Sequence, residues 1–143
     1  MQWQEVGEYS YAGSLSIRSI GAGELGDYIT DLVHVLRDSV NNGSPLGFRP
    51  PISLETARDY WISILPELRS GKRMLIVALN EAEVVGSAQL AFSQRREPPR
   101  HAAVEKVFVA RSVRGLGVGA VLMEAVEAAA LQHGRTLLLL GSV

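Results

Sequence analysis

The 143-residue chain contains no cysteine and only three histidines. The absence of cysteine excludes disulfides, thiol catalysis and cysteine-ligated zinc, and it is typical of a cytoplasmic protein. His34, His101 and His133 do not form a pair with metal-ligand spacing, so we expect no metal site.

Long apolar runs are absent as well. No window approaches the roughly 18 consecutive apolar residues of a membrane span. The first residues, Met1–Glu5, contain neither a basic segment nor an apolar one, which argues against a secretory signal. We therefore expect a cytoplasmic protein without a membrane partner.

The net charge of −1 conceals an asymmetry between the two halves of the chain. Residues 1–70 hold nine acids and five bases, whereas residues 71–143 hold six acids and nine bases. The second half suits a polyanionic ligand and the first an amine, although ordinary scatter of surface charge explains the difference equally well. Neither half is basic enough to indicate nucleic acid.

Hydrophobic periodicity predicts one domain of the mixed α/β (α+β) class. Residues 1–13 read as a leader and residues 14–143 as the domain. The expected order is β-α-α-β-β-β-α-β, in a largely antiparallel sheet flanked by helices, with the last strand parallel to an earlier one. The strands are expected at 14–20, 72–79, 84–93, 101–110 and 136–140, and the helices at 24–40, 54–70 and 117–132.

The most informative segment joins the strand at 101–110 to the helix at 117–132. It places Gly115, Gly117 and Gly119 directly after Arg114. Glycine adopts positive φ without strain and has no Cβ, so ligand oxygens can approach the backbone. The free N–H groups and the dipole of the first helical turn attract an anion. The segment therefore predicts a phosphate-binding site.

Other interpretations of these glycines fit less well. No Lys-Ser or Lys-Thr follows them, as a P-loop requires. A dinucleotide motif fitted to Gly115, Gly117 and Ala120 requires an acidic residue about 20 positions further on, and residues 135–140 contain none. A glycine-rich helix start that packs closely and binds nothing stays open.

The motif Arg114-x-x-Gly117-x-Gly119 follows the apolar Val107–Val109 and precedes an apolar helix. It resembles the acyl-CoA-binding motif of the GNAT superfamily of N-acetyltransferases, and the order of elements matches that fold. The resemblance implies acetyl-CoA as cofactor, with backbone amides of the turn around its pyrophosphate and its pantetheine arm along the preceding strand. The implied cofactor-binding residues are Val107, Phe108, Val109, Arg114, Gly115, Leu116, Gly117, Val118, Gly119 and Ala120.

The resemblance also implies acetyl transfer to an amine of a small molecule, directly within a ternary complex. Period-2 alternation predicts that His101, Ala103, Glu105, Val107 and Val109 share one face of their strand. Glu105 is the first candidate for the base and His101 the second, and a backbone N–H near Val107 would stabilise the oxyanion. The family often uses a tyrosine after the next strand to protonate the thiolate, but no tyrosine follows residue 60 here.

The acceptor side is less well defined. By resemblance, it involves the first two helices and the loop between them, which carry Phe48–Pro51, Tyr60 and Trp61. The two aromatic residues could line a pocket or pack in the core. Acidic residues that could attract an amine are Asp31, Asp38, Glu55 and Asp59.

A complete member of the family continues past Leu140 with a further helix and strands. The segment 136–140 is apolar on both alternating faces, which is typical of a strand buried on both sides. As a last element it would leave an unpaired apolar edge, so we expect a homodimer or other association through it. The alternative to an enzyme is a non-catalytic acyl-CoA-binding or interaction module.

Overall fold

The computed structural model describes residues 5–10, 14–44 and 46–140. Six strands form one sheet in the order β1-β2-β3-β4-β5-β6. Neighbouring strands are antiparallel except for β5 and β6, which are parallel, as the sequence predicts. The strands are β1 (Glu5–Ser10), β2 (Ser14–Ile20), β3 (Arg73–Asn80), β4 (Glu83–Phe92), β5 (His101–Val109) and β6 (Leu137–Leu140).

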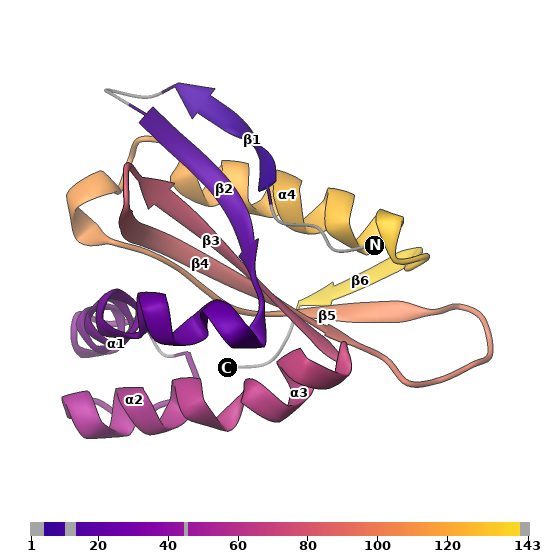
Figure 1. Cartoon of the computed structure of the whole chain (residues 1–143), viewed down its shortest axis with the longest axis horizontal. Helices are drawn as coiled ribbons and strands as arrows, with labels where there is room; N and C mark the ends of the chain where they lie inside the picture. Colours follow the sequence, from indigo (N-terminus) through magenta and orange to yellow (C-terminus); the bar gives the residue numbers. More distant parts are fainter. Residues whose placement is uncertain (1–4, 11–13, 45, 141–143) are drawn as a thin grey trace.

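Helices cover both faces of this sheet (Figure 1). Helix α1 (Leu25–Asn41), α2 (Leu54–Ser63) and α3 (Leu65–Ser70) lie on one face, and α4 (Val118–Gln132) lies on the other. Each layer has its own apolar core, one centred on Trp61 of α2 and one on Leu122 of α4, both fully buried. Because strands β3 and β4 face both cores, almost all of their side chains are buried. No helix in the described part of the chain is long and apolar enough to cross a membrane.

The prediction of a leader over residues 1–13 is wrong for residues 5–10. These form strand β1, which pairs antiparallel with β2, so that Tyr9 lies opposite Leu15. The apolar residues of this segment, Val6 and Tyr9, are three positions apart and do not alternate, so the pattern does not indicate a strand. Pairing with β2 supplies the main-chain hydrogen bonds, which a local pattern does not reveal.

The single helix predicted over residues 54–70 is two helices. Ser53 caps the first, since its hydroxyl accepts a hydrogen bond from the Thr56 N–H at 3.0 Å. The break falls at Ile64, just before Pro66 in the first turn of α3. Proline lacks the N–H that would continue the helix, and its ring collides with the carbonyl four residues earlier.

Strand β6 is not buried on both faces. It pairs with β5 alone in the described structure, and Leu137, Leu139 and Leu140 are 42%, 44% and 81% exposed. Only Leu138 packs against the core beneath α4. The four leucines match a buried strand in composition, but an edge position leaves most of their surface uncovered. Association through this edge stays a prediction.

The position of α4 depends on a close approach to β4. A Cβ built on Gly86 would lie 3.0 Å from Leu122 Cδ1, 3.3 Å from the Phe108 carbonyl oxygen and 3.4 Å from Val118 Cγ1. Only a residue without a side chain lets the start of α4 sit this close to the sheet. Gly86 therefore helps to place the glycine turn that precedes the helix.

We expect Gly86→Ala to lower the free energy of unfolding by about 1–3 kcal/mol, because the added methyl overpacks this contact. Chemical denaturation checks this. Gly26→Ala in α1 is the matched control, since a Cβ at Gly26 meets nothing within 4 Å. That variant should be as stable as the parent or more so, and equal losses in both variants would contradict the explanation.

Candidate active site

A β-bulge interrupts strand β5 at Lys106. The pairing with β4 runs Val109 with Gly86 and Phe108 with Ser87, and then shifts by one residue before Glu105 pairs with Gln89. Lys106 adopts a φ of 52°, which is rare for a residue with a side chain. Such a bulge places one extra residue in a strand and changes which faces the following side chains occupy.

The bulge overturns the predicted shared face of β5. Val107 and Val109 pack against the core on the α4 side. Glu105 bonds to Arg73 on the opposite side, where Phe108 packs near Trp61. Simple alternation fails because the extra residue restarts the period. The proposed base and the two valines therefore lie on opposite faces of the sheet.

The outer edge of β5 is open beyond Val104. Parallel pairing with β6 covers only His101 to Val104 within the described residues. The Ala110 N–H donates to the Val85 carbonyl at 2.8 Å. Because alternate residues of an antiparallel strand face the same neighbour, the main-chain groups of Phe108 and Ala110 turn toward β4. Those of Val107 and Val109 consequently turn outward, to the open edge, where an extended ligand can bind as a further strand does.

The glycine turn continues from this edge into α4. After a short 3₁₀ turn, Arg111–Val113, Gly115 and Gly117 take φ of 82° and 84°. Gly117 is the N-cap residue of α4, with no side-chain cap and no acidic residue in the first turn. The first bond of the helix is from the Val121 N–H to the Gly117 carbonyl. The amides that precede Val121 in the helix are therefore left for an outside acceptor.

The other residues of the motif divide into backbone and core roles. Phe108 and Val118 are buried, 4% and 1% exposed, so their side chains belong to the core. The main chain of Phe108 turns toward β4, whereas the Val118 amide lies in the uncapped first turn of α4. Leu116 is 48% exposed. The Arg114 Nε lies 3.4 Å from the Val109 carbonyl oxygen, which orients the guanidinium along the open edge. A Cβ at Gly119 would meet Val109 at 3.8 Å, an ordinary contact.

On the α2 face, Arg73 connects the candidate base to its surroundings. One of its nitrogens, Nη1, donates to Glu105 Oε1 at 2.9 Å and to Gln89 Oε1 at 2.8 Å, and Nε donates to Glu67 Oε1 at 3.0 Å. The Gln89 amide donates to the Tyr60 hydroxyl at 2.9 Å. The network thus fixes the carboxylate of Glu105 in place and joins β3, β4, β5, α2 and α3.

Burial and hydrogen bonding shift the pKa of two groups in this network. It raises the pKa of Tyr60 above its ordinary value, against the lowering effects of Gln89 and Arg73. Burial also acts to lower the pKa of the Arg73 guanidinium, but its hydrogen bonds to Glu105 and Glu67 outweigh this and raise it. Tyr60 therefore keeps its proton and Arg73 its charge at neutral pH.

Lys106 is a residue of this face that sequence reasoning missed. Its ammonium lies 5.6 Å from the ring centres of both Phe48 and Tyr60. Burial lowers the pKa of Lys106, Glu105 opposes that effect, and Arg73 adds to it. Lysine rarely adopts a positive φ, so nothing in the sequence indicates a bulge at Lys106 or distinguishes it from an ordinary surface lysine.

His101, the second candidate base, stands at the start of β5. It pairs with Leu137 of β6, four residues before Glu105 along the strand. The structure does not bring it into the Arg73 network.

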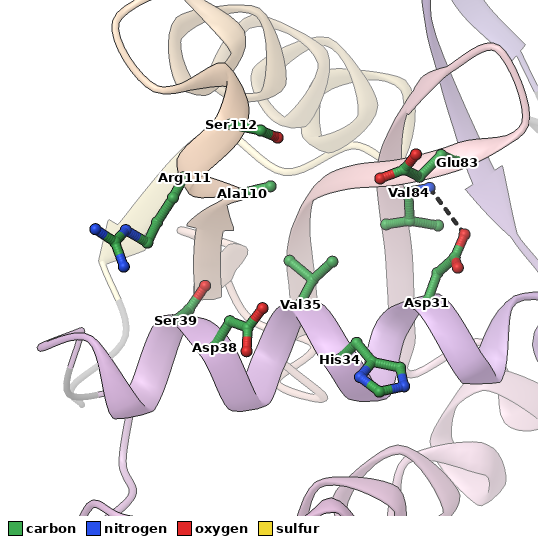
Figure 2. Close-up of a pocket in the computed structure, with 10 residues that line it drawn as sticks. All are labelled: Asp31, His34, Val35, Asp38, Ser39, Glu83, Val84, Ala110, Arg111 and Ser112. Atoms are coloured by element: carbon green, nitrogen blue, oxygen red, sulfur yellow. Dashed lines mark hydrogen bonds between the residues drawn. The ribbon is translucent and has the colours of Figure 1, made fainter.

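A cavity of about 250 Å³ lies between α1 and the residues just before the glycine turn (Figure 2). Asp31, Asp38 and Glu83 line it together with Arg111. Asp31 accepts a hydrogen bond from the Val84 N–H at 3.1 Å, so one of these carboxylates serves the fold. In the described part of the chain no three His, Asp or Glu side chains are arranged to hold a metal ion.

These features define a mixed α/β domain in which an open strand edge leads to an uncapped glycine turn at a helix N-terminus. The sequence profile of the acetyltransferase (GNAT) family matches residues 40–142, and the chain belongs to this family of acetyltransferases.

Solved structures agree in fold. A predicted acetyltransferase from Clostridium acetobutylicum, solved with acetyl-CoA, is 14% identical with a TM-score of 0.66 and covers 90% of this chain and 80% of its own. An aminoglycoside acetyltransferase from an uncultured soil metagenomic sample, in complex with sisomicin, is 17% identical with a TM-score of 0.67. The match covers 90% of this chain and 78% of that protein. An acetyltransferase from Trypanosoma brucei is 19% identical with a TM-score of 0.63, and the match covers 90% of this chain and 83% of that protein. At these identities the likeness establishes the fold.

Tyr60→Phe tests the polar network. Loss of the hydroxyl bonded to Gln89 should lower the free energy of unfolding by about 1 kcal/mol at neutral pH. Because the pKa of Tyr60 is raised above 10.0 in the folded protein, its stabilisation is present below that pH and is lost as the pH rises above it. Denaturation of both proteins at neutral and alkaline pH should show the difference shrinking. A difference that stays constant with pH would contradict burial of the phenol.

Proposed function

We propose that this protein binds acetyl-CoA at the glycine turn and along the open edge of β5. The observation that carries the proposal is the continuity of the two features. Outward main-chain groups at Val107 and Val109 lead directly to unpartnered amides around Gly117. A pantetheine arm can pair with the outward main-chain groups of the strand, and a pyrophosphate can accept hydrogen bonds from the unpartnered amides.

The acyl end of such a cofactor would lie near the bulge, next to Glu105. The carboxylate of Glu105, oriented by Arg73, would take a proton from the acceptor amine directly or through water. The amine nitrogen then attacks the thioester carbon, and the outward N–H of Val107 stabilises the oxyanion. The carbon–sulfur bond breaks and CoA leaves as the thiolate, so the acetyl group passes directly within one ternary complex.

The acceptor that we propose is a small molecule carrying an amine. It would approach from the α2 face, where Phe48 and Tyr60 meet edge to face with ring centres 5.6 Å apart. Glu67 and Glu105 lie on that face, where both pair with Arg73. A similar structure is named an aminoglycoside acetyltransferase, an example of an amine-rich small-molecule acceptor in this fold.

Acetyl-CoA should stabilise the chain against heat in a saturable way, and NAD should not, since the ligand adds RT ln(1 + [L]/Kd) to the free energy of unfolding. Gly117→Ala should reduce affinity by about tenfold or more, because strain at positive φ displaces the anion-binding amides. Gly134→Ala, at φ 70° with nothing within 4 Å of its Cβ, is the matched control at the other end of α4. It should lose stability but keep the shift with acetyl-CoA. Equal stabilisation by NAD, or no change in thermal stability with acetyl-CoA, would contradict the proposed cofactor.

Glu105→Gln tests the base. We expect thiol release from acetyl-CoA with an amine panel to fall by about 10²-fold or more, with loss of the acidic limb of the pH–rate profile. Glu67→Gln removes the other carboxylate bonded to Arg73 and serves as the control for effects on that network. An unchanged pH profile in Glu105→Gln would remove Glu105 from the reaction. A parent chain that binds acetyl-CoA but releases no thiol would instead be a binding module.

A further inference from the structure

Lysine is scarce in this protein, which has only Lys72 and Lys106 beside 12 arginines. The two lysines occupy different surroundings. Lys72 is exposed immediately before β3, whereas Lys106 is partly buried within β5. The chain therefore contains one lysine inside the candidate active site and one ordinary surface lysine for comparison.

The bulge directs the Lys106 amine toward the acceptor side. Lys106 stands between Glu105 and Val107, where the open edge of β5 begins. Its side chain lies on the α2 face, with Nζ over the rings of Phe48 and Tyr60, and Nζ is 3.0 Å from where a Cβ on Gly47 would be. The amine thus occupies the region through which we propose that an external amine approaches.

The path proposed for the cofactor ends at the same place. This step rests on the proposed function. An acetyl-CoA whose pyrophosphate is held around Gly117 and whose arm follows Val109 and Val107 brings its thioester to the bulge. The other lysine, Lys72, directly precedes Arg73 at the start of β3 and is exposed.

The charges around Lys106 leave its amine able to lose a proton. Glu105 on its own strand and Glu67 on α3 are both engaged by Arg73 of β3, and Tyr60 of α2 faces it with a neutral ring. Lys106 forms no ion pair in the described part of the chain. Burial lowers the pKa of Lys106, so that more of it is the free, nucleophilic amine at a given pH than of an exposed lysine.

We propose that Lys106 is a self-acetylation site, which takes the acetyl group from bound acetyl-CoA when no external acceptor is present. The neutral Nζ attacks the thioester carbonyl carbon, a carbon–nitrogen bond forms and the carbon–sulfur bond breaks. CoA leaves as the thiolate, and the proton lost from nitrogen passes to solvent or to the thiolate. The product is a stable amide on Lys106 and free CoA.

Acetylation would change the acceptor side in two ways. The amide carries no charge, so the cation–π contacts with Phe48 and Tyr60 are lost. The added acetyl group also occupies space in front of those rings. Modified protein should therefore turn over an external amine more slowly than unmodified protein. Self-acetylation would thus inhibit the enzyme when the acetyl-CoA concentration is high and the acceptor concentration is low.

Mass spectrometry of the full chain incubated with acetyl-CoA tests the proposal. We expect a gain of one acetyl group, mapped by peptide analysis to Lys106 in about tenfold or greater excess over Lys72, because binding places the thioester beside the amine. Excess CoA should suppress acetylation of Lys106 and leave that of Lys72 unchanged. The acetylation rate of Lys106 should also reach its plateau at a lower pH than that of Lys72.

Two arginine variants complete the experiment. Lys106→Arg keeps a cation over the rings but cannot form the stable amide, so the mass gain should disappear, whereas Lys72→Arg should retain it. Equal acetylation of the two lysines, or no acetylation of Lys106 in protein that acetyl-CoA stabilises against heat, would overturn the self-acetylation site and leave the proposed function standing. A chain that acetyl-CoA does not stabilise would overturn both.

Discussion

The bulge at Lys106 is the constraint on which the arrangement of the site depends. A strand that pairs regularly on both edges would bury every main-chain group of β5 in the sheet. One extra residue with φ of 52° shifts the register against β4 and coincides with the end of pairing to β6. The same local distortion brings Glu105 and Lys106 onto the same face. Backbone strain of this kind persists only where the surrounding packing holds it.

That packing comes from two separate cores. The α4 core holds the start of the helix close to the sheet, with Gly86 providing the space. The α1–α3 core surrounds Trp61, and the aromatic contacts from Phe48 through Tyr60 and Trp61 to Phe108 tie the loop after α1 to β5. The glycine turn therefore depends on one layer and the proposed acceptor side on the other, with β5 between them.

Electrostatics differ between the two ends of the site in a useful way. At the glycine turn the helix dipole and free amides favour an anion without any lysine at the turn itself. On the α2 face Arg73 is surrounded by Glu67, Glu105 and Gln89, so its charge is neutralised locally and orients the glutamates. The glycine turn therefore favours an anion, whereas the α2 face holds paired charges of both signs.

Sequence alone determined the order of the elements from β2 to β6 except for the division between α2 and α3, together with the parallel last strand and the location of the turn with Gly115 and Gly117. Hydrophobic periodicity and glycine at positive φ are local properties, and they can be read without knowing the partners of a residue. Even the boundaries of β3, β4 and α4 fell within a residue or so of those expected. The break before Pro66 could also have been read locally, since proline ends helices for a local reason.

Only the tertiary structure decided which side chains meet. Arg73, Gln89 and Glu105 come from three strands, and Tyr60 and Glu67 from two helices, so no spacing in the chain connects them. The bulge escaped prediction because the positive φ of Lys106 is fixed by the pairing with β4 before and after it and not by the preference of lysine. The exposure of β6 is likewise a matter of which strands pair with it. Local backbone preference follows from the sequence alone. Strand register, the face that each side chain occupies and the partners of each charge are fixed only when distant segments pack.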